Sequence, residues 1–207
     1  MSEEHYYDLV IVGAGPAGSS AAFSAAKEGI KVALIEKENS IAETVRTSGV
    51  TWVESIKEFG IPENCYNPIK NFSFVSPNNE VTITDSVATA AVLDVRKTYR
   101  WLADEAKKNG VDIFVKTNIN EVIKNEENDI VGVSGTGVSG KITFHSKVII
   151  DATGFTSTIS KAMGFVKQWK RFGAGAEYEA KVENSDPETW WLMVGQEYTP
   201  AGYAWIF

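Results

Sequence analysis

The chain has 207 residues, of which 43% are hydrophobic and 23% are charged, and its formal net charge is -7. This composition is typical of a folded soluble domain, and the acidic balance argues against a nucleic-acid-binding protein, which normally presents a basic surface. No run of about 18 apolar residues is present, so no membrane-spanning helix is expected. Cys65 is the only cysteine, which excludes an intrachain disulfide, and the acidic N-terminus resembles no targeting peptide, so a cytoplasmic location is expected.

The first predicted elements form a strand–helix–strand unit. Residues 8–12 are an apolar run that predicts a strand buried on both faces. Residues 16–28 are small and rich in alanine, which predicts a helix that ends at Gly29. Residues 31–35 predict a second buried strand, and the whole unit fits the length of one βαβ motif, about 30 residues.

The middle of the chain alternates helix and strand patterns. Helices are predicted over residues 51–59 and 93–109, and strands over 71–75, 80–84 and 112–116. Three short strands, 122–124, 130–134 and 141–145, predict an antiparallel meander, and residues 147–150 predict a separate buried strand. From Phe172 to Val182 apolar residues alternate strictly, which predicts a half-buried strand in one sheet with the strands of "TWWLMVG" and "GYAWIF".

A glycine-rich turn follows the first strand. Gly13 permits a tight turn, Gly15 allows a pyrophosphate to approach the backbone, and Gly18 allows the helix to pack closely on the sheet. Ala14, Pro16 and Ala17 fill the positions between them, and the helix N-terminus offers free N–H groups to phosphates. The turn therefore predicts a dinucleotide site.

An acid at the end of the second strand narrows the choice of nucleotide. Glu36, followed by Lys37, can accept both hydroxyls of an adenosine ribose, and its charge would repel a 2′-phosphate. NADP is therefore disfavoured, whereas NAD and FAD remain. Three further features favour FAD. They are Arg96 at the start of the long helix, Ile119 after a strand end, where its backbone would face the adenine, and "DATG" from Asp151 to Gly154 after a buried strand.

The order of glycine-rich turn, acid, helix arginine and "DATG" resembles flavoproteins with a glutathione-reductase-like FAD domain. Within them, "ETVRTSGVTW" and "TPAGYAWIF" look most like the geranylgeranyl reductase family, whose motifs are P-x-R/K-C-G and P-x-G-Y-x-W-x-F-P. The resemblance implies that Arg46, Thr47, Ser48 and Gly49 lie near the flavin. Thr47 stands where several family members carry a cysteine, and it is the predicted catalytic position although a hydroxyl is a poorer acid than a thiol.

The resemblance implies an FAD-dependent oxidoreductase that reduces isolated C=C bonds in isoprenoid chains of membrane lipids or their precursors. Tyr203 and Trp205 lie two residues apart on one face of a strand, where they would line a tunnel for the hydrocarbon substrate or fill a core. An external electron donor, NAD(P)H or of the ferredoxin type, is implied, and peripheral contact with a membrane is left open. No nucleic acid and no metal site are expected.

The predicted fold class is α/β: a Rossmann-like FAD-binding domain with a three-stranded meander, plus part of an antiparallel sheet. The expected domains are residues 1–165, with strands 70–92 contributing to the substrate domain, and a partial substrate-binding sheet over 166–207. A Gly-Asp motif that the family carries after this sheet is missing, so the chain is expected to be an N-terminal fragment. Two alternatives stay open: an FAD-dependent aromatic monooxygenase or halogenase, and a non-catalytic nucleotide-binding fragment.

Overall fold

The computed structural model describes residues 3–167, 169–183 and 185–207, and these ranges include every predicted site residue. The chain divides into two compact units, one made of Met1–Val45 with Tyr99–Gly173 and the other of Arg46–Thr98 with Ala174–Phe207. We call them the nucleotide unit and the sheet unit. The sheet unit takes a longer part of the middle of the chain than the expected strands 70–92. The assignment of a substrate role to it stays a prediction.

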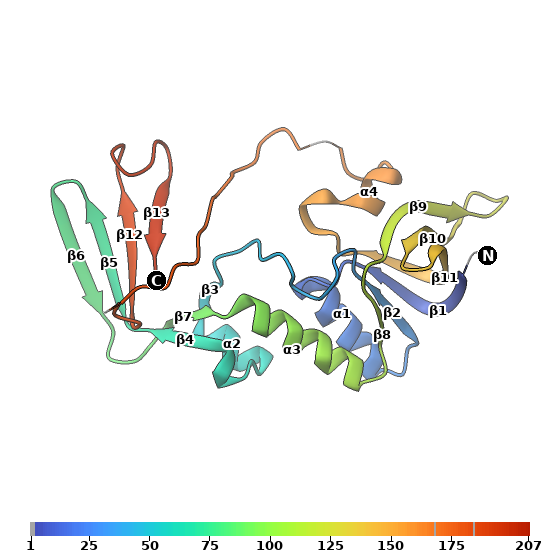
Figure 1. Ribbon diagram of the computed structural model, residues 1–207, viewed down its shortest axis with the longest axis horizontal. Coiled ribbons are helices and arrows are strands. Elements are labelled where there is room, and N and C mark those ends of the chain that lie inside the picture. The colour runs from blue at the N-terminus through green and yellow to red at the C-terminus, as the bar shows by residue number, and fades with distance from the viewer. Residues whose placement is uncertain (1–2, 168, 184) are drawn as a thin grey trace. The chain divides into compact units, whose positions relative to one another are not determined.

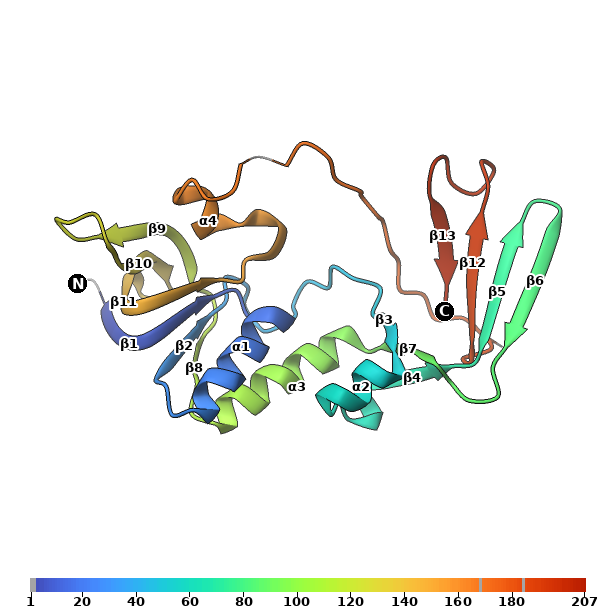
Figure 2. The same cartoon turned by 180° about the vertical axis from the view of Figure 1, so that it is seen from behind.

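The nucleotide unit is built on a six-stranded sheet in the order β8-β2-β1-β11-β10-β9. Its elements are β1 (Glu3–Val12), α1 (Pro16–Lys27), β2 (Val32–Ile35), the larger part of α3 (Val95–Lys108), β8 (Asp112–Phe114), β9 (Asn118–Lys124), β10 (Ile130–Gly137), β11 (Gly140–Asp151), the short 3₁₀ helix η2 (Gly154–Thr156) and α4 (Thr158–Ala162). The strands β8, β2, β1 and β11 are parallel, and β11, β10 and β9 form the antiparallel meander (Figure 2). The predicted α/β class and the meander are confirmed.

Two strands of this sheet are longer than the sequence predicts. The expected strands 141–145 and 147–150 are one continuous strand, β11, which pairs with β10 antiparallel and with β1 parallel. β1 begins at Glu3 instead of Asp8, because residues 3–7 pair in register with residues 142–146 of β11. The segment "EEHYY" has no apolar run. Its pairing with a distant strand and the packing of the His5 and Tyr7 rings near Phe144 make it part of the sheet.

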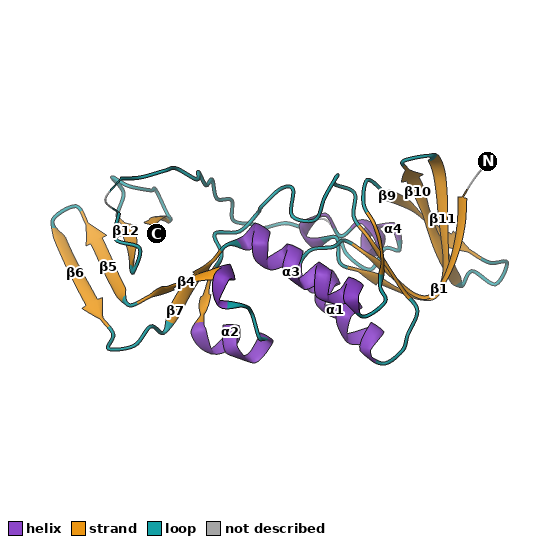
Figure 3. Ribbon diagram, turned by 60° about the horizontal axis from the view of Figure 1, so that its bottom comes forward, coloured by secondary structure: helices purple, strands orange, loops and turns teal. Residues whose placement is uncertain are grey.

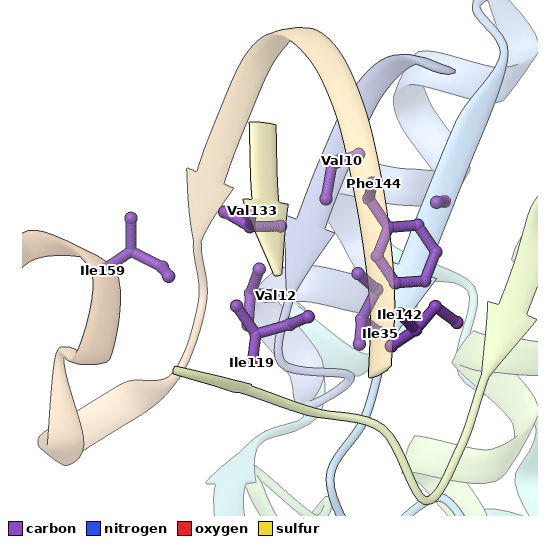
Figure 4. Close-up of a cluster of buried hydrophobic side chains, with 9 residues drawn as sticks. Val10, Val12, Ile35, Ile119, Val133, Ile142, Phe144 and Ile159 are labelled. Carbon is purple, nitrogen blue, oxygen red and sulfur yellow. The ribbon is translucent and has the colours of Figure 1, made fainter. Parts of the chain in front are cut away.

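The core of the nucleotide unit lies on both faces of this sheet. On one face, α1 and the C-terminal half of α3 cover β1 and β2 (Figure 3), and Ala22 and Ala106 pack with Leu9 and Ile11. On the other face, Val10 and Val12 pack with residues of the meander and α4 (Figure 4), namely Ile119, Val133, Ile142, Phe144 and Ile159. Successive residues of β1 thus enter opposite faces, which confirms a strand buried on both sides.

The sheet unit contains two small sheets (Figure 1). A three-stranded sheet has the order β3-β7-β4, and a four-stranded sheet has the order β13-β12-β5-β6. The elements are β3 (Val50–Trp52), α2 (Val53–Phe59), η1 (Glu63–Cys65), β4 (Tyr66–Ile69), β5 (Asn71–Ser76), β6 (Asn79–Thr84), β7 (Ala90–Leu93), β12 (Thr189–Val194) and β13 (Tyr203–Ile206). The predicted strands 71–75 and 80–84 and both C-terminal strands are confirmed, whereas the three-stranded sheet was not predicted.

The predicted strand over residues 172–182 is wrong. This segment has no regular secondary structure, and its apolar members Phe172, Tyr178 and Val182 are exposed. Alternation of apolar and polar residues shows only that the two faces of a strand would differ. A strand also needs a partner strand that accepts and donates hydrogen bonds to its backbone N–H and C=O groups. Among the described residues, the four-stranded sheet is completed by β12 and β13 instead, and glycine and alanine in "FGAGAEYEA" offer little apolar area to bury.

The predicted helices 51–59 and 93–109 are confirmed as α2 and α3 with shorter N-terminal ends. α2 ends at Gly60, which adopts the left-handed conformation that favours glycine at a helix C-terminus. α3 begins after Asp94, whose carboxylate accepts a hydrogen bond from the Lys97 backbone N–H at 3.0 Å. Within the described part of the chain, no helix is both long and apolar enough to cross a bilayer.

Candidate nucleotide site and sheet surface

The glycine-rich turn is held against the strand end of β11 by very close backbone contacts. Gly13 has φ of 105°, and a Cβ at this position would lie 2.3 Å from the carbonyl oxygen of Ala152. A Cβ on Gly18 would lie 1.9 Å from the carbonyl oxygen of Gly13. Any larger side chain at either position must displace backbone, so both glycines are required for the turn to form between β1 and α1.

Gly15 is different, because a Cβ placed on it would meet no atom within 4 Å. It is the N-terminal flanking residue of α1, Pro16 is the first helical residue, and no side chain caps the helix. The first N–H groups of an α-helix have no intrahelical acceptor, and the helix dipole favours negative charge there. Space in front of an uncapped helix N-terminus is what a dinucleotide pyrophosphate needs, so the residues present fit FAD.

Glu36 follows β2 and is already held in place by two backbone donors. One carboxylate oxygen accepts the N–H of Ala14 at 3.0 Å, and the other accepts the N–H of Glu38 at 3.0 Å. Each carboxylate oxygen can accept a further hydrogen bond, so both remain available to ribose hydroxyls. The half-buried carboxylate is thus tied directly to the glycine-rich turn. Its neighbour Lys37 is exposed.

Asp151 lies at the end of β11, and both of its carboxylate oxygens accept hydrogen bonds from nearby residues of the chain. One oxygen accepts the backbone N–H of Thr153 at 3.1 Å and its hydroxyl at 2.6 Å, and the other accepts the backbone N–H of Ser160 at 2.7 Å. Burial opposes ionisation, but these hydrogen bonds outweigh it and lower the pKa of the Asp151 carboxyl. The Thr153 hydroxyl in turn accepts the N–H of Thr158. Asp151 therefore organises the "DATG" turn and the start of α4.

The adjoining residues of this turn are partly open. Gly154 has φ of 65°, is exposed, and has free space where a Cβ would lie. Ala152 donates its N–H to the carbonyl of Val12 at 2.8 Å, which ties the "DATG" turn to the glycine-rich turn. Ile119, by contrast, is buried in the core cluster of the meander, so its side chain is unavailable to a ligand. Its predicted backbone contact with adenine stays a prediction.

In the sheet unit, the structure brings the predicted 46–49 segment to the start of α3. The carbonyl of Gly49 accepts the N–H of Leu93 at 3.0 Å, and a Cβ on Gly49 would lie 2.7 Å from the Leu93 carbonyl oxygen. Arg96 is the second residue of α3 and is half-buried. Arg46 and Thr47 are exposed, and Ser48 is half-buried. The proposed role of Thr47 rests on its position alone.

The four-stranded sheet has one apolar face. The register places Trp205, Leu192, Phe74 and Val81 in one row across the strands, and Trp190, Phe72 and Ile83 in another. Tyr203 pairs with Val194 on the same face, and its ring lies 5.8 Å from that of Trp205. The opposite face is mixed. It carries Trp191, Met193 and Ile206 together with a polar cluster in which the Ser73 hydroxyl donates to Glu80 at 2.7 Å. Tyr203 and Trp205 thus share a face, as predicted.

Residues that the sequence reasoning missed are Thr153 and Ser160, which hold Asp151, and Ser19. The buried Ser19 hydroxyl donates to the carbonyl of Ala14 at 3.2 Å and steadies the glycine-rich turn. An aspartate followed two residues later by threonine is a pattern for a local side-chain-to-backbone turn, which could have identified the Asp151–Thr153 pair. Nothing in the sequence indicates that Ser160 closes the same cluster.

Comparison with known proteins agrees with this geometry. A family model described as FAD dependent oxidoreductase matches residues 8–165. The chain is 36% identical over 208 residues to a digeranylgeranylglycerophospholipid reductase of Methanocaldococcus jannaschii, a match that covers 97% of this chain and 52% of that protein. A similarly named protein of Methanococcus vannielii is 34% identical, with coverage of 99% and 53%. The chain thus spans about half the length of the curated relatives it matches.

Solved structures show the same fold. A geranylgeranyl bacteriochlorophyll reductase-like protein from Thermoplasma acidophilum superposes with a TM-score of 0.80 at 26% identity, covering 99% of this chain and 54% of that one. The myxobacterial halogenase CndH superposes with a TM-score of 0.71 at 20% identity, covering 97% of this chain and 49% of that one, which shows the fold alone. The predicted resemblance to geranylgeranyl reductases and the predicted cofactor, FAD, are confirmed. The chain belongs to the FAD dependent oxidoreductase family.

Proposed function

We propose that the protein of which this chain forms a part reduces isolated C=C bonds in the isoprenoid chains of membrane lipids or their precursors. Bound FAD supplies the hydride chemistry of such a reduction. The similarity to proteins named digeranylgeranylglycerophospholipid reductase supports this substrate class. The structural observation that carries the proposal is the apolar face of the four-stranded sheet.

That face has the chemistry of a hydrocarbon-binding wall. Phe74, Val81, Ile83 and Tyr203 are all exposed although they stand in continuous apolar rows with half-buried aromatic residues. A monomeric soluble domain rarely leaves so many large apolar side chains together in water unless they meet a ligand or another surface. An isoprenoid chain has only C–H groups to offer, so it gains mainly from dispersion and from leaving water. We assign Tyr203 and Trp205 to this wall.

In the nucleotide unit, different residues bind different parts of the cofactor. The α1 N-terminus binds the pyrophosphate, with Gly15 leaving room for it, and Glu36 binds the adenosine ribose. Asp151 keeps the "DATG" turn in place. In the sheet unit, we propose that Arg46, Thr47, Ser48, Gly49 and Arg96 face the flavin. An external donor, NAD(P)H or a ferredoxin-type protein, supplies the electrons.

The test is an anaerobic assay of the full-length protein with a geranylgeranyl phospholipid and chemically reduced donor, followed by mass spectrometry of the lipid. We expect the lipid to gain two hydrogens for each double bond reduced, and the protein to release FAD on denaturation. A protein that releases FAD, leaves the lipid unchanged and consumes oxygen with an aromatic substrate would instead be a monooxygenase or halogenase. A protein that binds no flavin would be a non-catalytic nucleotide-binding protein.

A further inference from the structure

A basic and aromatic stretch of exposed residues follows the "DATG" turn of the nucleotide unit. No acidic residue occurs between Asp151 and Glu177, although the whole chain has a net charge of -7. The same stretch contains four cations and four large aromatic side chains. We call them the basic–aromatic patch, which comprises Phe155, Lys161, Phe165, Lys167, Trp169, Lys170, Arg171 and Phe172.

Three of the aromatic rings hold one another at the surface. The rings of Phe155 and Trp169 are stacked at 6.1 Å, and Phe155 meets Phe172 edge-on at 5.9 Å. The indole N–H of Trp169 donates to the Phe155 carbonyl at 3.2 Å. Yet Phe155 is 63% exposed, Phe172 71% and Trp169 46%. An ordered aromatic cluster that stays in water, with Phe165 also exposed, indicates a contact surface rather than a core.

The four cations of the patch are all exposed. Within residues 3–167, 169–183 and 185–207, no carboxylate lies within ion-pair distance of any of them. Their charges are therefore not neutralised by the protein itself. Since the rest of the chain is strongly acidic, this patch is where an anionic surface would be attracted and other faces would be repelled.

We propose that the basic–aromatic patch docks the protein on the surface of an anionic lipid bilayer. Tryptophan and phenylalanine favour the boundary between headgroups and acyl chains, where an apolar ring is buried and an indole N–H stays hydrated. Lysine and arginine beside them gain from anionic headgroups. The acidic remainder of the chain sets the orientation by repulsion. Binding of the patch to a bilayer does not depend on the proposed function. The purpose of this binding, access to lipid substrates, rests on the proposed function.

The test measures binding of the full-length protein to vesicles, without turnover. Co-sedimentation would compare vesicles of phosphatidylcholine with vesicles of an equal mixture of phosphatidylcholine and phosphatidylglycerol, at low and high salt. The patch variant carries Lys161→Gln, Lys167→Gln, Lys170→Gln and Arg171→Gln. The control variant carries the same loss of charge at exposed lysines elsewhere, Lys57→Gln, Lys107→Gln, Lys141→Gln and Lys181→Gln.

We expect the parent protein and the control variant to bind the vesicles that contain phosphatidylglycerol more tightly than those of phosphatidylcholine alone. High salt should weaken this binding. The patch variant should bind at least about tenfold more weakly, because each cation near such a surface adds to the attraction. A second variant, Trp169→Ala with Phe172→Ala, should also bind more weakly, and its residual binding should be more sensitive to salt. FAD content should be unchanged in all variants, which separates this test from that of the proposed function.

Four results would overturn the proposal. One is equal binding to both kinds of vesicle, and another is equal loss of binding in the patch and control variants. The third is retention of a single-stranded RNA oligonucleotide by the patch in place of vesicles, because aromatic rings with cations also suit stacked bases. If the remainder of the full-length protein covers the patch, the patch variant would bind as the parent does, which counts against the proposal as well.

Discussion

The two units use their sheets in opposite ways. The six-stranded sheet of the nucleotide unit is covered on both faces, and Val10, Ile11 and Phe144 are completely buried. The four-stranded sheet of the sheet unit exposes an apolar face that includes Phe74 and Tyr203. In our proposal the first sheet is a scaffold whose loops bind the cofactor, whereas the second binds the substrate on its own face. Four experiments test or sharpen this contrast, and they follow in order of decreasing expected effect.

The largest expected effect comes from matched phenylalanines, one in each sheet. Phe144→Ala leaves a cavity among residues that are fully buried, and we expect it to lower the free energy of unfolding by about 3–5 kcal/mol. Phe74→Ala, at a side chain that is 43% exposed, should cost less than about 1.5 kcal/mol but weaken activity on isoprenoid lipids. Denaturant unfolding and lipid assays of the full-length variants measure both. Equal destabilisation would mean that the apolar face is structural.

The next largest effect is expected from a substitution in the glycine-rich turn of the nucleotide unit, where backbone atoms lie very close together. Gly13→Ala places a Cβ 2.3 Å from the Ala152 carbonyl oxygen at a φ that alanine disfavours, so we expect a loss of about 2–4 kcal/mol and no bound FAD. Gly29→Ala is the control, because Gly29 also has positive φ but open space around it. It should cost only about 1 kcal/mol and retain FAD. Similar losses in both variants would show that strain alone, not the close contact, matters.

A smaller effect is expected at the carboxylate that holds the "DATG" turn. Asp151→Asn turns one acceptor into a donor facing the Ser160 N–H, and we expect a cost of about 1–2 kcal/mol near neutral pH. The folded-state pKa of Asp151 lies below its ordinary value of 3.8. Its ionised form therefore stabilises the fold above that value, and this contribution disappears as the pH falls through the folded-state pKa.

The gap in unfolding midpoint between the parent and Asp151→Asn should accordingly narrow as the pH is lowered below about 4. Asp104→Asn, the same substitution at an exposed position of α3, is measured beside it as the reference. A gap that stays constant with pH would mean that the carboxylate charge does not hold the turn.

The smallest effect on stability is expected at Gly15, the open position of the turn. Gly15→Ala should change the free energy of unfolding by less than about 1 kcal/mol, since its Cβ meets no protein atom. It should nevertheless weaken FAD binding, because the methyl group takes space that a pyrophosphate needs. Titration with FAD, monitored by flavin fluorescence, measures the affinity. Unchanged affinity would place the pyrophosphate away from Gly15.

Local sequence patterns were sufficient where short-range chemistry decides the structure. The glycines of the turn, the helix that follows them and the acid after β2 all lie within about 30 residues, the length of one βαβ unit, and each was predicted. The strict alternation of residues 172–182 misled, because alternation describes side chains and says nothing about a backbone partner. "EEHYY" misled in the opposite direction, since it joins β1 through long-range pairing with β11 and through ring contacts with Phe144.

The sequence by itself determined the βαβ unit, the dinucleotide turn and the resemblance to a flavoprotein family. The tertiary structure alone decided that β11 pairs with β1 and β10 at once, and that β12 runs parallel to β5. The physical reason is the separation along the chain of the residues that interact. Propensity, turn chemistry and periodicity are local, whereas strand partners are chosen among residues far apart in the chain.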